Sequence, residues 1–209
     1  MIYLKADAVT KIKICGIKTF KDIEYINEAQ PDYIGFVFAK SKRRVDFNLA
    51  CLLKTRLDQH IQAIGVFVNE DITFIKKICD RNIIDIVQIH GDEDEEYIST
   101  LKKAVCKPII KAVRVKERMN KLYNYADYIL FDTFSKVEYG GTGESFSWNM
   151  IKGYLKPFFL AGGLSYSNVA DAIHLAQPYC VDISSGVETN GFKDRQKIID
   201  VVNLVRSVR

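Results

Sequence analysis

The sequence lacks the features that mark several classes of protein. No apolar run approaches membrane-spanning length, and lysines and an aspartate interrupt the only N-terminal stretch that could form a signal core. The five cysteines include no CxxC pair, and the three histidines, His60, His90 and His174, form no ligand-spaced pair. We therefore expect a soluble cytoplasmic protein that has neither a disulfide framework nor a metal site.

Charge is not gathered into blocks either. Lysine and arginine number 30 against 26 acidic residues, and the resulting formal net charge of +4 is spread along the chain. The densest basic cluster, Lys42, Arg43 and Arg44, has the size to bind one small anion rather than a polyanion. We expect a small-molecule ligand, and neither nucleic acid nor a membrane as a partner.

The sequence does contain a regular alternation of two patterns. Short runs rich in β-branched or aromatic residues alternate with longer amphipathic segments, which is typical of βα units and a parallel sheet. The strand candidates are 9–16, 33–38, 63–68, 85–91, 108–115, 128–133, 158–164 and 180–187. Helical periodicity occurs in 20–29, 71–82, 95–105, 165–176 and 194–208.

About eight βα units are the number that closes a barrel. We therefore predict an α/β protein in which residues 1–209 form a single (β/α)8 TIM barrel domain. A doubly wound open sheet is the competing architecture. Such a sheet would normally carry a glycine-rich turn after its first strand, whereas "CGIKTF" has one glycine.

Polar residues collect at the ends of the expected strands, where a barrel of this kind binds its ligands. Side-chain alternation places Lys11, Lys13 and Cys15 on the inner face of the first strand, with isoleucines on the outer face. The inward polar residues of the later strands are Gln88, His90, Asp132, Asp182 and Ser184. Because burying such a set is costly without ligands or partners, we predict a binding site at these strand ends.

Cys15 and Asp132 are the candidates for chemistry. Lys13 lies two residues before Cys15 on the same face, and its positive potential favours a thiolate that could act as a nucleophile or a base. Asp132 interrupts an apolar run at the barrel mouth. Two structural alternatives stay open, since a free cysteine also fills apolar cores and a carboxyl also forms structural ion pairs.

Two further candidates are Arg43, which could clamp a carboxylate, and His90, which could act as an acid or base. A solvated arginine and a hydrogen-bonded structural histidine are the alternatives. Segments "LAGGLSYSN" and "DISSGVETNG" follow the seventh and eighth strands, where barrels bind phosphate, and the first predicts a helix start near Ser165. The predicted phosphate ligands are Gly162, Gly163, Ser184 and Ser185.

The segments "KICGI", "GFVFAKSKR", "VQIHGDE", "FDT", "YGGTGESFSW", "AGGL" and "VDISSGVE" follow one another in an order that resembles phosphoribosylanthranilate isomerase of tryptophan biosynthesis. The resemblance implies a cofactor-independent Amadori rearrangement of N-(5-phosphoribosyl)anthranilate to 1-(2-carboxyphenylamino)-1-deoxyribulose 5-phosphate. It implies that Cys15 is the general base, with a lowered pKa, and that Asp132 is the general acid, with a raised pKa. It also implies that Arg43 binds the anthranilate carboxylate, and that His90 and Asp182 line the pocket.

Two features of the sequence, the segment 139–148 and Ser147, allow more than one interpretation. Residues 139–148 could form a flap or an ordinary surface loop, and Ser147 replaces an acidic residue or amide that is common in the family. The competing functions are a neighbouring phosphosugar barrel enzyme, such as indole-glycerol-phosphate synthase, and a catalytically silent barrel that binds a phosphate ligand. We expect a free-standing monomer or homodimer.

Overall fold

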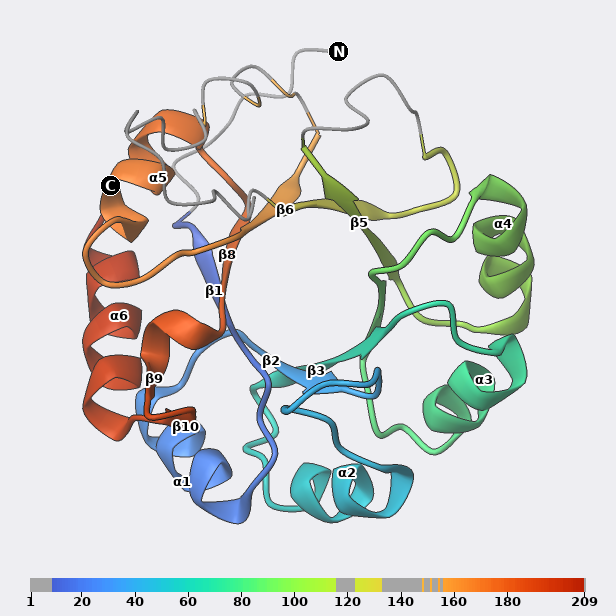
Figure 1. The fold of residues 1–209 in the computed structure, drawn as a ribbon, viewed down its shortest axis with the longest axis horizontal. Coiled ribbons are helices and arrows are strands. Elements are labelled where there is room, and N and C mark those ends of the chain that lie inside the picture. The colour runs from blue at the N-terminus through green and yellow to red at the C-terminus, as the bar shows by residue number, and fades with distance from the viewer. Residues whose placement is uncertain are drawn as a thin grey trace.

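A computed structural model describes residues 9–115, 123–132, 148, 151, 154 and 156–208. Eight parallel strands form a closed barrel in chain order, and the helices lie around it (Figure 1). The strands are β1 (Lys11–Cys15), β2 (Tyr33–Val37), β3 (Gln62–Phe67), β4 (Ile86–Ile89), β5 (Ile109–Arg114), β6 (Tyr128–Asp132), β7 (Phe158–Ala161) and β8 (Cys180–Ile183). The ring closes because β1 pairs in parallel with both β2 and β8. The predicted (β/α)8 fold is therefore confirmed, while the assignment of residues 1–209 to one domain stays a prediction.

The described helices lie where the sequence periodicity predicts them, with two differences. They are α1 (Phe20–Ala29), α2 (Phe47–Lys54), α3 (Ile72–Asp80), α4 (Glu95–Ala104), α5 (Val169–Ala176) and α6 (Arg195–Ser207). Helix α2 was not among the expected helices, and α5 begins at Val169 rather than near Ser165. The later start of α5 has a local cause, because the Asn168 side chain accepts a hydrogen bond from the Ser165 amide and holds a turn before the helix.

Polar residues fix where most of these helices begin. The side chains of Thr19, Asp46, Asp71, Asp94 and Asp194 each accept a hydrogen bond from a backbone amide in the first turn of α1, α2, α3, α4 and α6. In α1 the cap is reciprocal, because Asp22 also accepts from the Thr19 amide. The loop between β1 and α1 is therefore short and well held.

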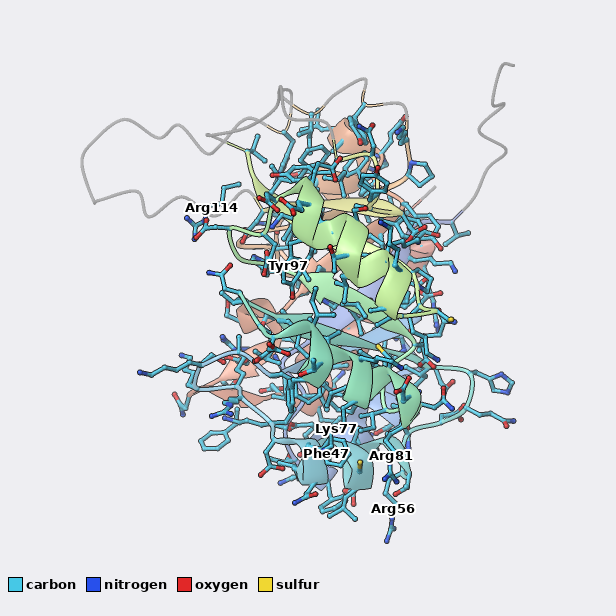
Figure 2. All side chains as sticks on the ribbon, turned by 90° about the vertical axis from the view of Figure 1, so that its right-hand side faces the viewer. Phe47, Arg56, Lys77, Arg81, Tyr97 and Arg114 are labelled. Carbon is cyan, nitrogen blue, oxygen red and sulfur yellow. The ribbon has the colours of Figure 1, made fainter. Side chains whose placement is uncertain are left out.

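The core has two parts, one inside the barrel and one between the strands and the helices. The inner part contains Tyr33, Ile64, Ile86, Ile110, Ala112, Leu130, Phe159, Ala161 and Cys180. Ile12 and Ile14 belong to the outer part, so the predicted alternation of β1 is confirmed. Neighbouring helices also contact through polar side chains, as where Lys77 of α3 lies 4.7 Å from the ring centre of Phe47 of α2 (Figure 2).

The amino end of the barrel is filled by aromatic rings around one ammonium. Lys11 Nζ lies 5.3 Å from the ring centres of both Tyr33 and Tyr179, whose hydroxyls are 3.0 Å apart. Tyr128 stacks on Tyr179 at 5.6 Å. Within the described part of the chain, no helix is long and apolar enough to span a membrane.

Candidate active site

Cys15 lies at the carboxyl end of β1, beside Gly35 of β2 in the sheet register. A Cβ atom built on Gly35 would come within 2.6 Å of Cys15 Sγ. The sulfur thus occupies space that only a glycine at position 35 leaves open. The residue is partly exposed, as a group that must reach a ligand requires.

A buried ion pair lies next to this thiol. Lys13 is fully buried, and its Nζ lies 2.7 Å from Asp182 Oδ2 and 2.7 Å from Gln88 Oε1. Burial alone would lower the pKa of Lys13, but the charge of Asp182 raises it above its ordinary value, so the ammonium persists. The structure therefore brings together Lys13, Gln88 and Asp182 from three strands.

The pKa of Cys15 moves in the direction opposite to the one expected. Burial raises the pKa of the thiol above its ordinary value, and the ammonium groups of Lys13 and Lys193 oppose this effect without reversing it. The prediction of a lowered pKa for Cys15 is therefore wrong. The sequence shows that a lysine is near, but not that Asp182 already neutralises it or that the sulfur loses so much hydration.

His90 and Asp132 lie together on the other side of the barrel. His90 Nε2 is 3.2 Å from Asp132 Oδ2, and His90 Nδ1 is 2.9 Å from Gln88 Nε2. Both side chains are about a quarter exposed, at 29% and 24%. The structure thus places the predicted acid beside the predicted histidine, a contact between β6 and the end of β4 that the sequence did not reveal.

Arg43 reaches the site across the backbone of Gly16. Gly16 has φ +87°, and a Cβ atom there would overlap the Arg43 side chain. Arg43 Nε and Nη2 donate to the two carboxylate oxygens of Glu188 at 2.6 and 2.8 Å, and Lys193 Nζ donates to the same carboxylate at 2.9 Å. Although the loss of water around its side chain opposes this effect, these two cations lower the pKa of Glu188 to about 2.

Sequence reasoning missed both Glu188 and Lys193. Glu188 stands in the segment "VDISSGVE", but 145 residues separate it from Arg43. It lies in β9 (Glu188–Thr189), which pairs with β10 (Phe192–Lys193) in a short hairpin after β8. The planar Arg43 fork was the one available signal, since it implied an acidic partner but not which one.

The two predicted phosphate-binding loops contact each other at the carboxyl ends of β7 and β8. Gly162 and Gly163 both adopt left-handed φ values, 101° and 64°. A Cβ atom on Gly186 would overlap the carbonyl oxygen of Leu164, so the second loop packs directly on the first. Between them they carry all four residues predicted to bind phosphate.

The two predicted serines differ in their surroundings. The Ser184 hydroxyl donates to the carbonyl oxygen of Cys15 at 3.1 Å, which ties the second loop to β1. Ser185 is exposed and begins a short 3-10 helix, η2 (Ser185–Val187). Asp182, also predicted to line the pocket, has one buried oxygen, Oδ1, with no partner among the described residues.

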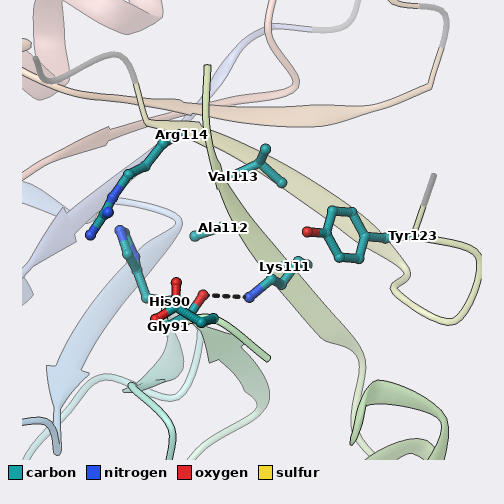
Figure 3. Close-up of a pocket in the computed structure, with 8 residues that line it drawn as sticks. His90, Gly91, Lys111, Ala112, Val113, Arg114 and Tyr123 are labelled. Atoms are coloured by element: carbon teal, nitrogen blue, oxygen red, sulfur yellow. Dashed lines mark hydrogen bonds between the residues drawn. The ribbon is translucent and has the colours of Figure 1, made fainter. Parts of the chain in front are cut away.

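Arg114 is another residue that the sequence reasoning did not single out. It ends β5, and alternation with Ile110 and Ala112, which face the barrel interior, turns it toward the mouth. Figure 3 shows Arg114 beside His90 in a pocket that is also lined by Lys111 and Tyr123. The sequence could have indicated Arg114 as a site residue, because it is the last residue of its strand that faces the barrel interior.

Two expectations concern residues beyond these contacts. Segment 139–147, including Ser147, lies outside the described residues, so the flap is not placed. Among the described residues, no group of three or more His, Cys, Asp or Glu side chains could hold a metal ion.

Known proteins resemble this chain over nearly its whole length. A family model described as N-(5'phosphoribosyl)anthranilate (PRA) isomerase matches residues 12–204. N-(5'-phosphoribosyl)anthranilate isomerase of Endomicrobium trichonymphae is 52% identical over 198 residues, covering 95% of this chain and 99% of that protein. The enzyme of the same name from Thermoanaerobacter sp. (strain X514) is 44% identical over 206 residues, covering 96% and 100%.

Solved structures agree with these sequence matches. The crystal structure of phosphoribosyl anthranilate isomerase from Thermotoga maritima superposes with a TM-score of 0.82 at 34% identity, covering 94% of this chain and 98% of that one. A phosphoribosyl anthranilate isomerase in complex with reduced 1-(o-carboxyphenylamino)-1-deoxyribulose 5-phosphate gives 0.78 at 31% identity, covering 93% and 97%. The family model, the sequence relatives and the solved structures agree, and the chain belongs to the N-(5'-phosphoribosyl)anthranilate isomerase family.

Proposed function

We propose that this chain isomerises N-(5'-phosphoribosyl)anthranilate in tryptophan biosynthesis, without a cofactor. The observation that carries the proposal is the position of a thiol and a carboxyl at the ends of β1 and β6, both on strand faces turned into the barrel. The printed names of the relatives support this substrate. An alternative barrel enzyme would need another acid and base at the same strand ends.

Each group takes one proton-transfer role. Asp132 protonates the ring oxygen of the ribose as the C1–O bond breaks, which leaves a Schiff base between C1 and the anthranilate nitrogen. Cys15, as thiolate, removes the proton from C2 and gives an enolamine, which tautomerises to the ketone. The reaction is an internal redox change, because C2 is oxidised while C1 is reduced. Lys13 and Lys193 stabilise the thiolate while it forms.

The remaining residues would hold the substrate at both ends. Arg43 directs Nε and Nη2 to Glu188, which leaves Nη1 to donate to the anthranilate carboxylate. Gly162, Gly163, Ser184 and Ser185 would surround the phosphate. Asp182 Oδ1, buried without a partner in the described structure, would accept a hydrogen bond from a sugar hydroxyl.

Turnover of N-(5'-phosphoribosyl)anthranilate, followed by its fluorescence, tests the proposal. We expect activity in the wild type and losses of about 10²- to 10⁴-fold in kcat for Cys15→Ala and Asp132→Asn, because each removes one proton-transfer group. Binding of a reduced product analogue should persist in both variants, since neither change removes the carboxylate or phosphate ligands.

Two matched variants control for losing a thiol or a carboxylate elsewhere. Cys51→Ala in α2 and Asp80→Asn on the surface of α3 should turn over substrate at the wild-type rate. Near-wild-type rates in Cys15→Ala or Asp132→Asn would remove that residue from the mechanism. Complementation of a tryptophan auxotroph tests the same function in a cell. The cytoplasmic location and the monomeric or dimeric state stay predictions.

A further inference from the structure

A continuous chain of hydrogen bonds crosses the barrel interior between the residues around the base and the acid. It runs from Asp182 Oδ2 to Lys13 Nζ (2.7 Å), Lys13 Nζ to Gln88 Oε1 (2.7 Å), and Gln88 Nε2 to His90 Nδ1 (2.9 Å). The last link joins His90 Nε2 to Asp132 Oδ2 at 3.2 Å. Lys13 and Gln88 are almost fully buried, at 0% and 1% exposure, so water does not compete for them.

Only one assignment of donors and acceptors is consistent with this series of hydrogen bonds. Lys13 can only donate, so the atom of Gln88 that it contacts must be the amide oxygen. The amide nitrogen of Gln88 then faces His90 Nδ1 and donates to it, which makes Nδ1 an acceptor without a proton. The proton of a neutral imidazole must therefore sit on Nε2, from which it is donated to Asp132.

We propose that Lys13 and Gln88 are positioning residues that hold His90 in its neutral Nε2–H form, and that His90 in turn positions the carboxyl group of Asp132. The inference rests on the proposed function, because positioning Asp132 contributes to catalysis only if Asp132 is the general acid. A neutral donor suits that purpose. An imidazolium beside Asp132 would favour the ionised carboxylate and remove the proton that the acid must deliver.

Lys13 prevents the rearrangements that would charge His90. A second proton on Nδ1 would face the amide nitrogen of Gln88, donor against donor. Rotating the amide would relieve that conflict but would turn the amide nitrogen toward the ammonium of Lys13, which is again donor against donor. Each arrangement leaves buried polar groups unpaired, which is unfavourable.

The charged groups that face His90 act in opposite directions. Arg114 of β5 lies beside the ring in Figure 3 and disfavours a second positive charge, while Asp132 and Asp92 favour it. Lys111, from the same pocket, is paired with Glu93 at 2.7 Å. The series of hydrogen bonds from Asp182 to Asp132 does not transfer protons, because the Gln88 amide neither gains nor loses a proton at ordinary pH.

Nitrogen NMR on the wild-type protein labelled in histidine and glutamine tests the hydrogen-bond direction without any substrate. At about pH 7 we expect His90 to show one unprotonated Nδ1 and one protonated Nε2, with a scalar coupling between Nδ1 and the Gln88 amide nitrogen. His60 and His174 are exposed and serve as internal controls for tautomer averaging. A protonated Nδ1, or tautomer averaging like that of the controls, would overturn the proposal.

Two substitutions test the consequence for catalysis. Gln88→Glu places a carboxylate against Nδ1, so His90 should become doubly protonated at about pH 7 and kcat should fall about tenfold or more, with KM changed less than about threefold. Gln88→Met removes both hydrogen bonds at similar volume, and its kcat should fall with tautomer averaging at His90. A wild-type kcat in either variant would overturn the positioning role, so the test holds even if the other variant folds poorly.

The two proposals fail in different ways. If the wild type does not turn over N-(5'-phosphoribosyl)anthranilate, the proposed function fails whatever the state of His90. If it does, and Asp132→Asn abolishes turnover while the NMR signals show a protonated Nδ1, the function stands and the positioning chain is wrong.

Discussion

At the scale of single residues, the charged groups of the site are arranged in pairs that orient one another. Lys13 is held by Asp182 inside the barrel, and Arg43 by Glu188 at its mouth. Removing one partner of a buried pair typically costs about 3–5 kcal/mol, because the other charge is left without compensation. Such pairs therefore fix where a cation points, at the risk of a large loss when one partner changes.

Glu188→Gln tests whether the carboxylate orients Arg43. We expect KM for N-(5'-phosphoribosyl)anthranilate to rise about tenfold with a smaller change in kcat, because an amide accepts from only one of the two Arg43 nitrogens and leaves the fork poorly aimed. Steady-state kinetics of the purified variant measure this. The free energy of unfolding of the variant should also fall less steeply between about pH 4.5 and 2, because Glu188, with a folded pKa of about 2, contributes stability that is lost as it is protonated in this range.

A surface pair provides the matched control for that substitution. Glu28 accepts from Arg195 in a similar two-point geometry, but both side chains are about half exposed, at 46% and 50%. Glu28→Gln should leave both kinetic constants unchanged, since exposed pairs contribute little. An unchanged KM in Glu188→Gln would mean that Arg43 needs no partner to bind the substrate.

Residue positions were easier to predict than residue environments. Alternation along β1 and the strand-end rule were enough to place Cys15, Asp132 and Arg43 near the mouth of the barrel. The direction of the Cys15 pKa was not predictable, because it depends on how much burial outweighs Lys13 and Lys193. The partner of Arg43 was equally hidden, since contacts between residues 145 positions apart leave no periodic pattern.

At the scale of elements, strands and most helices follow from local pattern, while loop contacts do not. Each of the eight strand candidates overlaps one strand of the barrel, although β3 begins one residue before its candidate, at Gln62, and α1 has the predicted bounds. The eight residues of α2 bury only Ala50 and Leu53, which is too little periodicity to predict a helix, although Asp46 offered a capping signal. The contact of Gly186 with Leu164 is a property of two loops and became visible only in the fold.

Gly186→Ala tests that loop contact. Its added methyl would overlap the Leu164 carbonyl and push the two phosphate loops apart. We expect kcat/KM to fall about 10- to 100-fold, the range in which misplacement of a binding group by about 1 Å acts. Affinity for inorganic phosphate as a competitive inhibitor should fall with it, which kinetics at several phosphate concentrations would measure.

Gly191→Ala separates a steric effect from a backbone effect. Gly191 lies in the same segment with φ +81°, but nothing lies within 4 Å of an added Cβ atom. This variant should lose about 1–2 kcal/mol of stability from its left-handed backbone and keep its phosphate affinity. If both variants lose phosphate affinity equally, loop strain rather than the contact with Leu164 would explain the result.

At the scale of the whole molecule, the closed barrel creates an interior in which ionisable groups lose water together. Its amino end is filled by Tyr33, Tyr128 and Tyr179 around Lys11, and its carboxyl end carries the chemistry. Closure was predictable from the number of βα units. The sequence did not predict which side chains would stay charged inside the barrel. A buried side chain stays charged only if several strands bring partners to it, as they do for Lys13, Gln88 and Asp182.

This shared burial predicts that the folded protein loses stability at alkaline pH. Burial raises the pKa of Cys15 and Cys180 and raises that of Cys79 to about 11, whereas an unfolded thiol ionises near about 8.5. Above about pH 9 the unfolded chain therefore holds fewer protons than the folded protein, so the free energy of unfolding must fall as pH rises. Lys193 opposes this trend, because burial lowers its pKa.

Urea unfolding at about pH 8, 9.5 and 10.5 measures the slope of stability against pH. Cys79→Ala is the informative variant, because the packing that it removes costs the same free energy at every pH, while the loss of a thiol with a raised pKa changes the slope. Its stability should therefore fall less steeply than that of the wild type between about pH 9 and 11. A wild-type free energy of unfolding that stays level across this range would show that the buried thiols ionise as easily in the barrel as in the unfolded chain.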